Sequence, residues 1–240
     1  MRLTEFNTLT FDCYGTLIDW ESGIHAALQP LVAKAGAPLS REVVLEAFGR
    51  EEAAQEAETP RMIYSGILTE VHRRLAKEWG VTMGEEDHGR FGASVPDWPA
   101  FPDSPEALAY LKQHYRLVIL SNVDRVSFAG SNRRLGVVFD AICTAQDIGS
   151  YKPDPANFDY MLRHLAGMGV GKADILHTAQ SLFHDHVPAK KVGLATAWID
   201  RRHDQSGWGA TPQPAEEGRY DFRFESLGAM AEAHRAALAA

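Results

Sequence analysis

Short apolar segments alternate with amphipathic ones along much of this chain. Apolar runs that end in polar residues are typical of strands buried on both faces of a parallel sheet and separated by helices. We therefore predict an α/β fold with a doubly wound, Rossmann-like parallel sheet. The predicted strands lie within residues 9–15, 115–124, 173–181 and 193–201, and residues 140–151 contain an apolar run that can form another.

The segments between these runs carry helix-start signals. Ser104 is a candidate N-cap, and Pro105 suits the first helical position after it. Asp154 and Pro155 begin a second helix in the same way, with glycines closing it. The predicted helices cover residues 104–115, 154–169 and 185–194.

Residues 21–94 break the alternation, because three helical patterns follow one another there without a strand between them. A helical block within a β/α alternation indicates an inserted subdomain. A proline-rich segment, residues 94–105, leads back to the core, and the polar residues 201–220 are expected to form a surface loop. The helical patterns cover residues 23–36, 40–58 and 62–80, and the predicted units are a core of residues 1–18 and 96–240 and a helical cap of residues 19–95.

Composition and charge argue mainly against certain classes of protein, such as nucleic-acid-binding, disulfide-rich and membrane-spanning ones. The net charge is -8 and the basic residues are scattered, which does not favour a nucleic-acid partner. Cys13 and Cys143 lie far apart in a chain long enough to form its own core, so we expect free thiols and a cytoplasmic location. No run approaches the ~18 apolar residues of a membrane span. Apolar cap helices could pair two subunits in a homodimer.

Polar residues follow several of the predicted strands. Asp12, Ser121 and the stretch Gln180–Asp185 each come just after a strand, and Lys152 follows the apolar run before it. Ligands of open parallel sheets bind at the carboxyl ends of the strands. Singly, each residue has a structural explanation: Asp12 could cap a turn, Lys152 could be solvated and Asp185 could cap a helix. Their joint placement predicts a site.

The residue types in this set fit nucleophilic chemistry. A carboxylate such as Asp12 is ionised at neutral pH and can attack without a base to activate it. Lys152 could balance its charge and aim its oxygen, and Asp185 could position a water molecule. Candidate donors to an anionic group of a small-molecule substrate are Thr16, Ser121 and Asn122.

Four segments resemble, in order and spacing, the motifs of the haloacid dehalogenase superfamily: FDCYGTLID, LSNVD, YKPDP and AQSLFHDHVPAKKVGL. The match extends over almost the whole chain, and the helical block after the first motif resembles the inserted cap of that superfamily. The resemblance implies a hydrolase in which Asp12 bonds covalently to substrate, with Lys152, Ser121 and Asp185 as further catalytic residues.

The first motif distinguishes between reactions. Phosphatases of the superfamily usually carry D-x-D, and the second aspartate protonates the departing alkoxide. This chain has Asp12-Cys13-Tyr14. Losing a general acid would cost a phosphatase about 10²–10⁴-fold, whereas a halide leaves without a proton. The D-x-Y-G-T form resembles the type II (S)-2-haloacid dehalogenases, with Tyr14 lining the substrate site.

The fourth motif bears on the cofactor. The phosphatases often show G-D and a later D that help to bind Mg²⁺, whereas this chain has Ala179-Gln180 and retains Asp185. The resemblance therefore implies that no cofactor is required. Mg²⁺ stays open as an alternative, bound by Asp12, Asp185 and a backbone carbonyl.

Other positions depart from the dehalogenase pattern. Phe158 stands where those enzymes carry a tyrosine, and Leu182 falls in a stretch where they have serine and asparagine. They also use a cap arginine to bind the substrate carboxylate or the halide. Arg50 is the candidate for that role, and Arg61 and Arg41 are the alternatives.

The remaining side chains near the motifs are expected to pack rather than react. We expect His184 or His186 to line the cleft without binding a metal. Cys13 should point to the opposite side of the strand from Asp12, and Trp20 and Trp98 should belong to the core.

The sequence thus predicts displacement of a halide from a small 2-haloalkanoic acid by Asp12, followed by hydrolysis of the aspartyl ester. Two alternatives stay open. One is an Mg²⁺-dependent phosphatase of a small metabolite, and the other is a non-catalytic relative that uses its cleft for binding.

Overall fold

A six-stranded parallel sheet forms the centre of the molecule in a computed structural model that describes residues 1–36, 38–213 and 218–239. Its strand order is β3-β2-β1-β4-β5-β6, so the chain winds outward from β1 to β3 and then returns to continue on the other side. The predicted doubly wound fold is therefore confirmed. The strands are β1 (Thr8–Phe11), β2 (Arg116–Ser121), β3 (Ala141–Thr144), β4 (Ile175–Ala179), β5 (Ala195–Ile199) and β6 (Phe222–Phe224).

Every predicted strand is present, and β6 is the addition. It has three residues and only partly buried side chains, so no apolar run marks it in the sequence. The winding reverses between β1 and β4, where Phe11 pairs with Ile119 on one side and with Thr178 on the other. The carboxyl end of β1 consequently lies at the switch point of the sheet, where such folds bind ligands.

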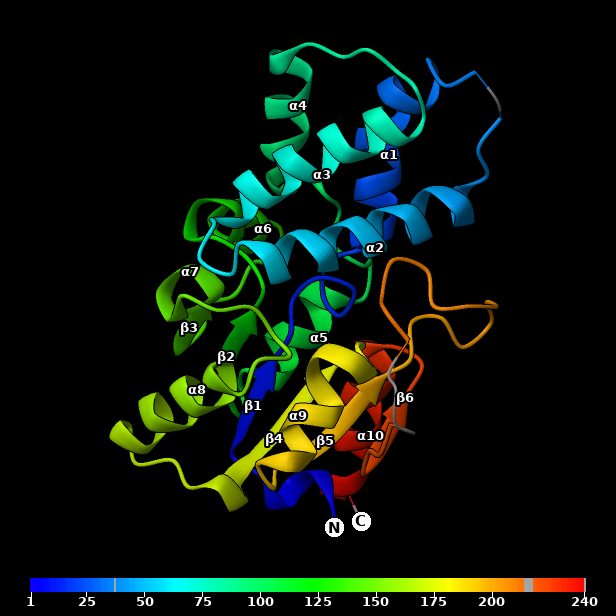
Figure 1. Cartoon of the computed structure of the whole chain (residues 1–240). Coiled ribbons are helices and arrows are strands. Elements are labelled where there is room, and N and C mark those ends of the chain that lie inside the picture. The colour runs from blue at the N-terminus through cyan, green and yellow to red at the C-terminus, as the bar shows by residue number, and fades with distance from the viewer. Residues whose placement is uncertain (37, 214–217, 240) are drawn as a thin grey trace.

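Helices cover both faces of the sheet. Along β2, Leu117 and Ile119 belong to one apolar cluster and Val118 and Leu120 to the other, as the two-residue period of a strand requires. Figure 1 shows α8 and α9 on one face and α5 and α10 on the other. The core helices are α5 (Ser104–Leu111), α6 (Arg125–Leu135), α7 (Ala145–Ile148), α8 (Pro155–Gly167), α9 (Val187–Lys191) and α10 (Leu227–Ala239), with single turns η1 (Leu3–Glu5), η2 (Val95–Asp97), η3 (Lys172–Asp174) and the π-helical η4 (Leu182–His186).

Four of the helices that come between β1 and β2 in the chain lie beyond the carboxyl ends of the strands in space (Figure 1). Asp19 caps α1 by accepting a hydrogen bond from the Ser22 amide at 3.1 Å, and Ser40 caps α2 through the Val43 amide at 3.3 Å. The unit boundaries at residues 18/19 and 95/96 stay a prediction. The helices are α1 (Trp20–Val32), α2 (Arg41–Glu58), α3 (Tyr64–Glu78) and α4 (Glu85–Gly92).

Local capping differs from the sequence prediction at one helix and matches it at another. The N-cap of α5 is Asp103 rather than Ser104, and the helix ends at Leu111, four residues before the predicted end. The Asp154 carboxylate caps α8, accepting a hydrogen bond from the Ala156 amide at 2.8 Å. That prediction is confirmed.

The loop predicted over residues 201–220 is not wholly at the surface. Ala210 and Thr211 are buried, because the loop folds back against α2, and the carbonyl of Ala210 lies close to Gly49. Residues 214–217 of the same prediction lie outside the described residues. The expectation of an exposed loop is therefore wrong around Ala210.

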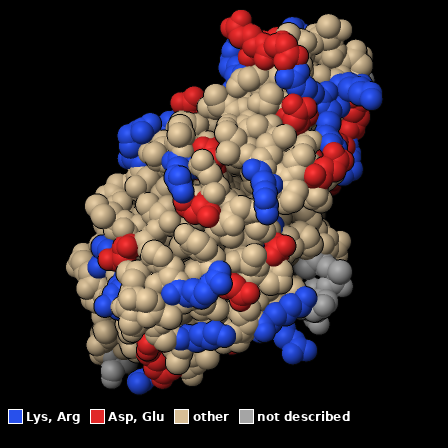
Figure 2. Space-filling view, turned by 60° about the vertical axis from the view of Figure 1, so that its left-hand side comes forward, with Lys and Arg blue, Asp and Glu red and all other residues tan. Residues whose placement is uncertain are grey.

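Charged side chains of both signs are interspersed over the face shown in Figure 2, which carries no continuous basic area. None of the helices in the described residues is long and apolar enough to cross a membrane. Both cysteines are buried free thiols, as expected. The cytoplasmic location, the homodimer and the absence of a nucleic-acid partner stay predictions.

We expect Gly49→Ala to destabilise the fold. A Cβ at Gly49 would lie 2.2 Å from the carbonyl oxygen of Ala210, which is backbone and cannot move aside cheaply. Overpacking of this kind costs about 1–3 kcal/mol. Gly89 in α4 is the matched control, because a Cβ there meets nothing within 4 Å and Ala favours a helix by about 0.5–1 kcal/mol. Urea denaturation measures both, and equal free energies of unfolding for the two variants would contradict the packing.

Candidate active site

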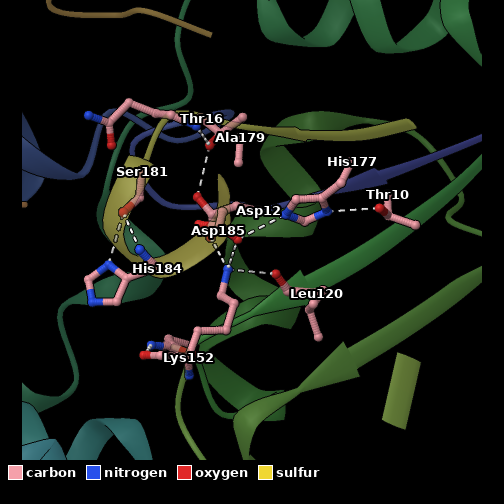
Figure 3. A network of polar contacts seen from close by, with 12 residues as sticks. Thr10, Asp12, Thr16, Leu120, Lys152, His177, Ala179, Ser181, His184 and Asp185 are labelled. Atoms are coloured by element: carbon pink, nitrogen blue, oxygen red, sulfur yellow. Dashed lines mark hydrogen bonds and ion pairs between the residues drawn. The ribbon is translucent and has the colours of Figure 1, made fainter. Parts of the chain in front are cut away.

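A buried ammonium joins the residues predicted from the strand ends. The Lys152 Nζ donates hydrogen bonds to Asp12 Oδ1 at 2.9 Å, to Asp185 Oδ1 at 2.7 Å and to the carbonyl oxygen of Leu120 at 3.0 Å (Figure 3). The lysine side chain is 1% exposed. The predicted convergence of Asp12, Lys152 and Asp185 is therefore present in the structure.

The turn after β1 orients Asp12. Its amide donates to the Thr178 carbonyl at 3.2 Å and so extends the ladder between β1 and β4 by one residue. Gly15 follows with φ +87°, a conformation that favours glycine, and allows the chain to turn back. The Thr16 hydroxyl then donates to Asp12 Oδ2 at 2.8 Å and accepts from the Gln180 amide at 2.9 Å. Both oxygens of Asp12 thus have a fixed donor.

Asp185 is fixed by a second chain of contacts. His177 Nε2 lies 3.0 Å from Asp185 Oδ1, and His177 Nδ1 lies 2.8 Å from the hydroxyl of Thr10 (Figure 3). Asp185 Oδ2 has no hydrogen-bond partner among the described residues. His177, whose role the sequence analysis did not predict, therefore positions Asp185.

Burial and charge act against each other in this cluster. Burial raises the pKa of Asp12, and the Lys152 ammonium offsets only part of that rise. For Asp185 burial acts in the same direction, but Lys152 and the His177 hydrogen bond outweigh it and lower the pKa. Burial alone would lower the pKa of Lys152, and the two carboxylates reverse that effect and raise it. The lysine therefore stays charged.

Asn122 and Tyr14 do not present their polar groups to a substrate. The Asn122 amide group donates to the Lys152 carbonyl at 3.0 Å, and its oxygen accepts from the Lys152 amide at 2.7 Å, so it positions the lysine. The Tyr14 hydroxyl lies 3.0 Å from Ser131 Oγ, and its ring lines the cavity. Ser121 also lines the cavity, and its hydroxyl has no hydrogen-bond partner in the described part of the chain.

Arg50 lies elsewhere. Its side chain is 55% exposed and pairs with Glu51 at 3.1 Å and with Glu78 at 2.5 Å. It is absent from the described residues that line the cavity around Asp12, and so are the alternatives Arg41 and Arg61. The prediction of a cap arginine in the site is wrong, because this part of α2 turns Arg50 toward α3.

Two glutamates of α2 line the cavity instead, and the sequence analysis missed them. Glu52 is buried and accepts a hydrogen bond from the Tyr64 hydroxyl at 2.5 Å. Burial raises its pKa to about 7. Burial and the neighbouring Glu52 also raise the pKa of Glu56. A spacing of four residues on a helix was the signal that could have marked them as a pair.

The histidines and apolar replacements have definite places. His184 lines the cavity beside Ser181, and burial lowers its pKa to about 4, whereas His186 is buried and bonds to the Ala179 carbonyl. Phe158 packs edge-on against His177, with ring centroids 5.1 Å apart.

The side chains that were expected to pack in the core are buried. Cys13 and Trp98 lie in the core as expected, and Trp20 is buried and also lines the cavity.

The donor set fits a metal ion poorly. Asp12 and Asp185 each offer oxygens, but the Lys152 ammonium already lies against one oxygen of both and would repel a cation there. Within residues 1–36, 38–213 and 218–239, no three side chains of His, Cys, Asp or Glu gather where they could bind a metal ion.

Two sequence comparisons match this chain to known proteins. A family model of haloacid dehalogenase-like hydrolases matches residues 6–177. The (S)-2-haloacid dehalogenase 4A of Burkholderia cepacia is 26% identical over 211 residues, which cover 80% of this chain and 82% of that protein.

Solved structures share the fold. The L-2-haloacid dehalogenase of Xanthobacter autotrophicus with chloropropionic acid covalently bound has a TM-score of 0.76 at 20% identity, covering 96% of this chain and 98% of that one. A magnesium-bound HAD-hydrolase from Bacillus subtilis has a TM-score of 0.74 at 17% identity, covering 96% of this chain and 99% of that one.

We expect Glu52→Gln to remove part of the pH dependence of folding stability. The ordinary pKa of 4.5 rises to about 7 in the folded protein, so folding takes up a proton between these pH values. The contribution of Glu52 to stability is complete below about pH 4.5 and is lost as the pH rises through 7, by up to about 3 kcal/mol. Glutamine cannot titrate, so the variant gains stability relative to wild type at pH 8 but not at pH 4.5.

Urea denaturation at the two pH values measures this difference. The matched control is Glu58→Gln on the same helix, because the Glu58 side chain is 60% exposed and pairs with Arg74. An equal stability difference between wild type and Glu52→Gln at both pH values would show that burial does not raise the pKa of Glu52.

Proposed function

This chain belongs to the haloacid dehalogenase-like hydrolases, and on that premise we propose that it hydrolyses a carbon–halogen bond of a small molecule with Asp12 as the nucleophile. The observation that carries the proposal is the environment of Asp12. Its two oxygens are oriented by Lys152 and Thr16, and its side chain lines a cavity between the strand ends and the helices that cover them.

In the first step an oxygen of Asp12 attacks the carbon that bears the halogen. A bond forms between that oxygen and the carbon, the carbon–halogen bond breaks, and the halide leaves with the bonding electron pair. The Lys152 ammonium and the Thr16 hydroxyl keep the carboxylate in one orientation, which lowers the entropic cost of attack.

The nature of the leaving group follows from position 14. An alkoxide would need a proton, but the Tyr14 hydroxyl bonds to Ser131, and burial raises its pKa well above the ordinary value. A halide is the anion of a strong acid and needs none. The environment of Tyr14 therefore supports halide displacement over phosphate-ester cleavage.

In the second step water attacks the carbonyl carbon of the aspartyl ester. Asp185 Oδ2 has no hydrogen-bond partner in the described residues and can accept a proton from that water, while His177 and Lys152 fix the other oxygen. Asp185 then returns this proton to the departing alkoxide, and the acid formed at position 12 releases its own proton. The products are an alcohol, which keeps an oxygen of Asp12, a regenerated carboxylate, which gains the oxygen of the water, and one proton. The reaction uses no cofactor.

The 2-haloalkanoic acids named for the relatives are the first substrate class to test. In a single turnover of (S)-2-chloropropionate in ¹⁸O water, we expect chloride release and one ¹⁸O atom in the Asp12 carboxylate, read by mass spectrometry of the peptide. Asp12→Asn should lower turnover by at least about 10⁴-fold, because an amide is a poor nucleophile.

The control is Asp19→Asn, which changes the N-cap of α1 rather than a cavity-lining carboxylate. Release of phosphate from an aryl phosphate with Mg²⁺, with ¹⁸O in the phosphate, would replace the proposal by the phosphatase alternative. Neither activity, together with metabolite binding, would point to the non-catalytic one.

A further inference from the structure

The helix that covers the site contributes two acids to it. Glu52 and Glu56 lie four residues apart on α2, so both project from the same side of the helix. They line the cavity that also contains Asp12, and they are 6% and 8% exposed. Two largely buried carboxyl groups thus share a cavity with the proposed nucleophile.

The protein supplies a hydrogen-bond partner to only one of these two carboxyl groups. Glu52 accepts a hydrogen bond from Tyr64, but Glu56 makes no hydrogen bond or ion pair with any described residue. The Ser121 hydroxyl, on the same cavity and 2% exposed, is also without a partner among those residues. A buried polar group without a partner costs free energy, so the Ser121 hydroxyl indicates a ligand with a polar group, and Glu56 lines the cavity in which that ligand would lie.

The charge of the cavity selects the kind of ligand. Its described lining contains four acidic side chains and one basic one, Lys152, whose three donors are all used by Asp12, Asp185 and the Leu120 carbonyl. A substrate carboxylate would enter beside these acids without a free cation to pair with. An ammonium group would bring three donors and a positive charge to the same place.

We infer that Glu52 and Glu56 bind a protonated amine of the substrate, on the α2 side of the carbon that Asp12 attacks. The inference rests on the proposed function and narrows its substrate class from 2-haloalkanoic acids to small haloalkylamines. Tyr64 fixes Glu52, the Glu56 carboxyl group has no partner among the described residues, and the positive charge of a bound amine favours the ionised form of both groups. The rings of Tyr14 and Trp20 line the same cavity and favour a cation over an anion.

Three substrates of similar size test the charge preference: 3-chloropropylamine, the neutral isostere 1-chlorobutane, and (S)-2-chloropropionate. We expect kcat/KM for chloride release to be about 10- to 100-fold higher for the amine than for either other compound, the range that a charge-assisted hydrogen bond supplies. Glu56→Gln should collapse the ratio of amine to chlorobutane, mainly through KM of the amine. Glu58→Gln, exposed on the same helix, should leave the ratio unchanged.

Binding without turnover separates the two proposals. Calorimetric titration with n-propylammonium, which has no leaving group, should show binding to wild type and at least about 10-fold weaker binding both of n-propylammonium to Glu56→Gln and of propionate to wild type. Absence of n-propylammonium binding, or an amine ratio that survives Glu56→Gln, would overturn the cation site. Chloride release from chlorobutane or chloropropionate but not from the amine would overturn the inference and leave the proposed function standing. Amine binding without chloride release from any compound would overturn the proposed function alone.

Discussion

The ion pairs of the buried Lys152 ammonium with Asp12 and Asp185 are the constraint on which the site depends. Two carboxylates this close would repel each other, and their burial would favour protonation. One ammonium, which donates to both carboxylates and to the Leu120 carbonyl, offsets their repulsion and part of the effect of burial on Asp12. Removing one partner of a buried ion pair costs about 3–5 kcal/mol because the other charge is left unpaired, so these three side chains depend on one another at the junction of the strand ends.

This constraint limits what the remaining residues can do. Lys152 is fully engaged and cannot also bind a substrate anion, and Asn122 is engaged with the backbone of Lys152. We propose that recognition of the substrate depends instead on two carboxyl groups of a covering helix, Glu52 and Glu56, where a carboxylate-binding enzyme would need a cation. The proposed nucleophile and the proposed recognition groups would then come from different layers of the molecule.

Most of the core could be predicted from local pattern, because buried parallel strands are continuous apolar runs and several helices begin at clear caps such as Asp154. The elements that were missed depend on distant contacts. Strand β6 is short and half-buried, and it forms because β5 offers it an edge. Ala210 is buried because the loop after β5 folds back onto Gly49 of α2, a contact that no local pattern could indicate.

Residue order alone was enough to predict the family, the fold and the cluster of Asp12, Lys152 and Asp185, because parallel strands bring residues at their carboxyl ends to one edge of the sheet. Which side of α2 faces that edge depends on packing between segments far apart in the chain. This helix carries charged and small residues around its circumference, so its periodicity marks no buried side. At 3.6 residues per turn, Arg50 and Glu52 lie on nearly opposite sides, and packing turned the glutamate inward.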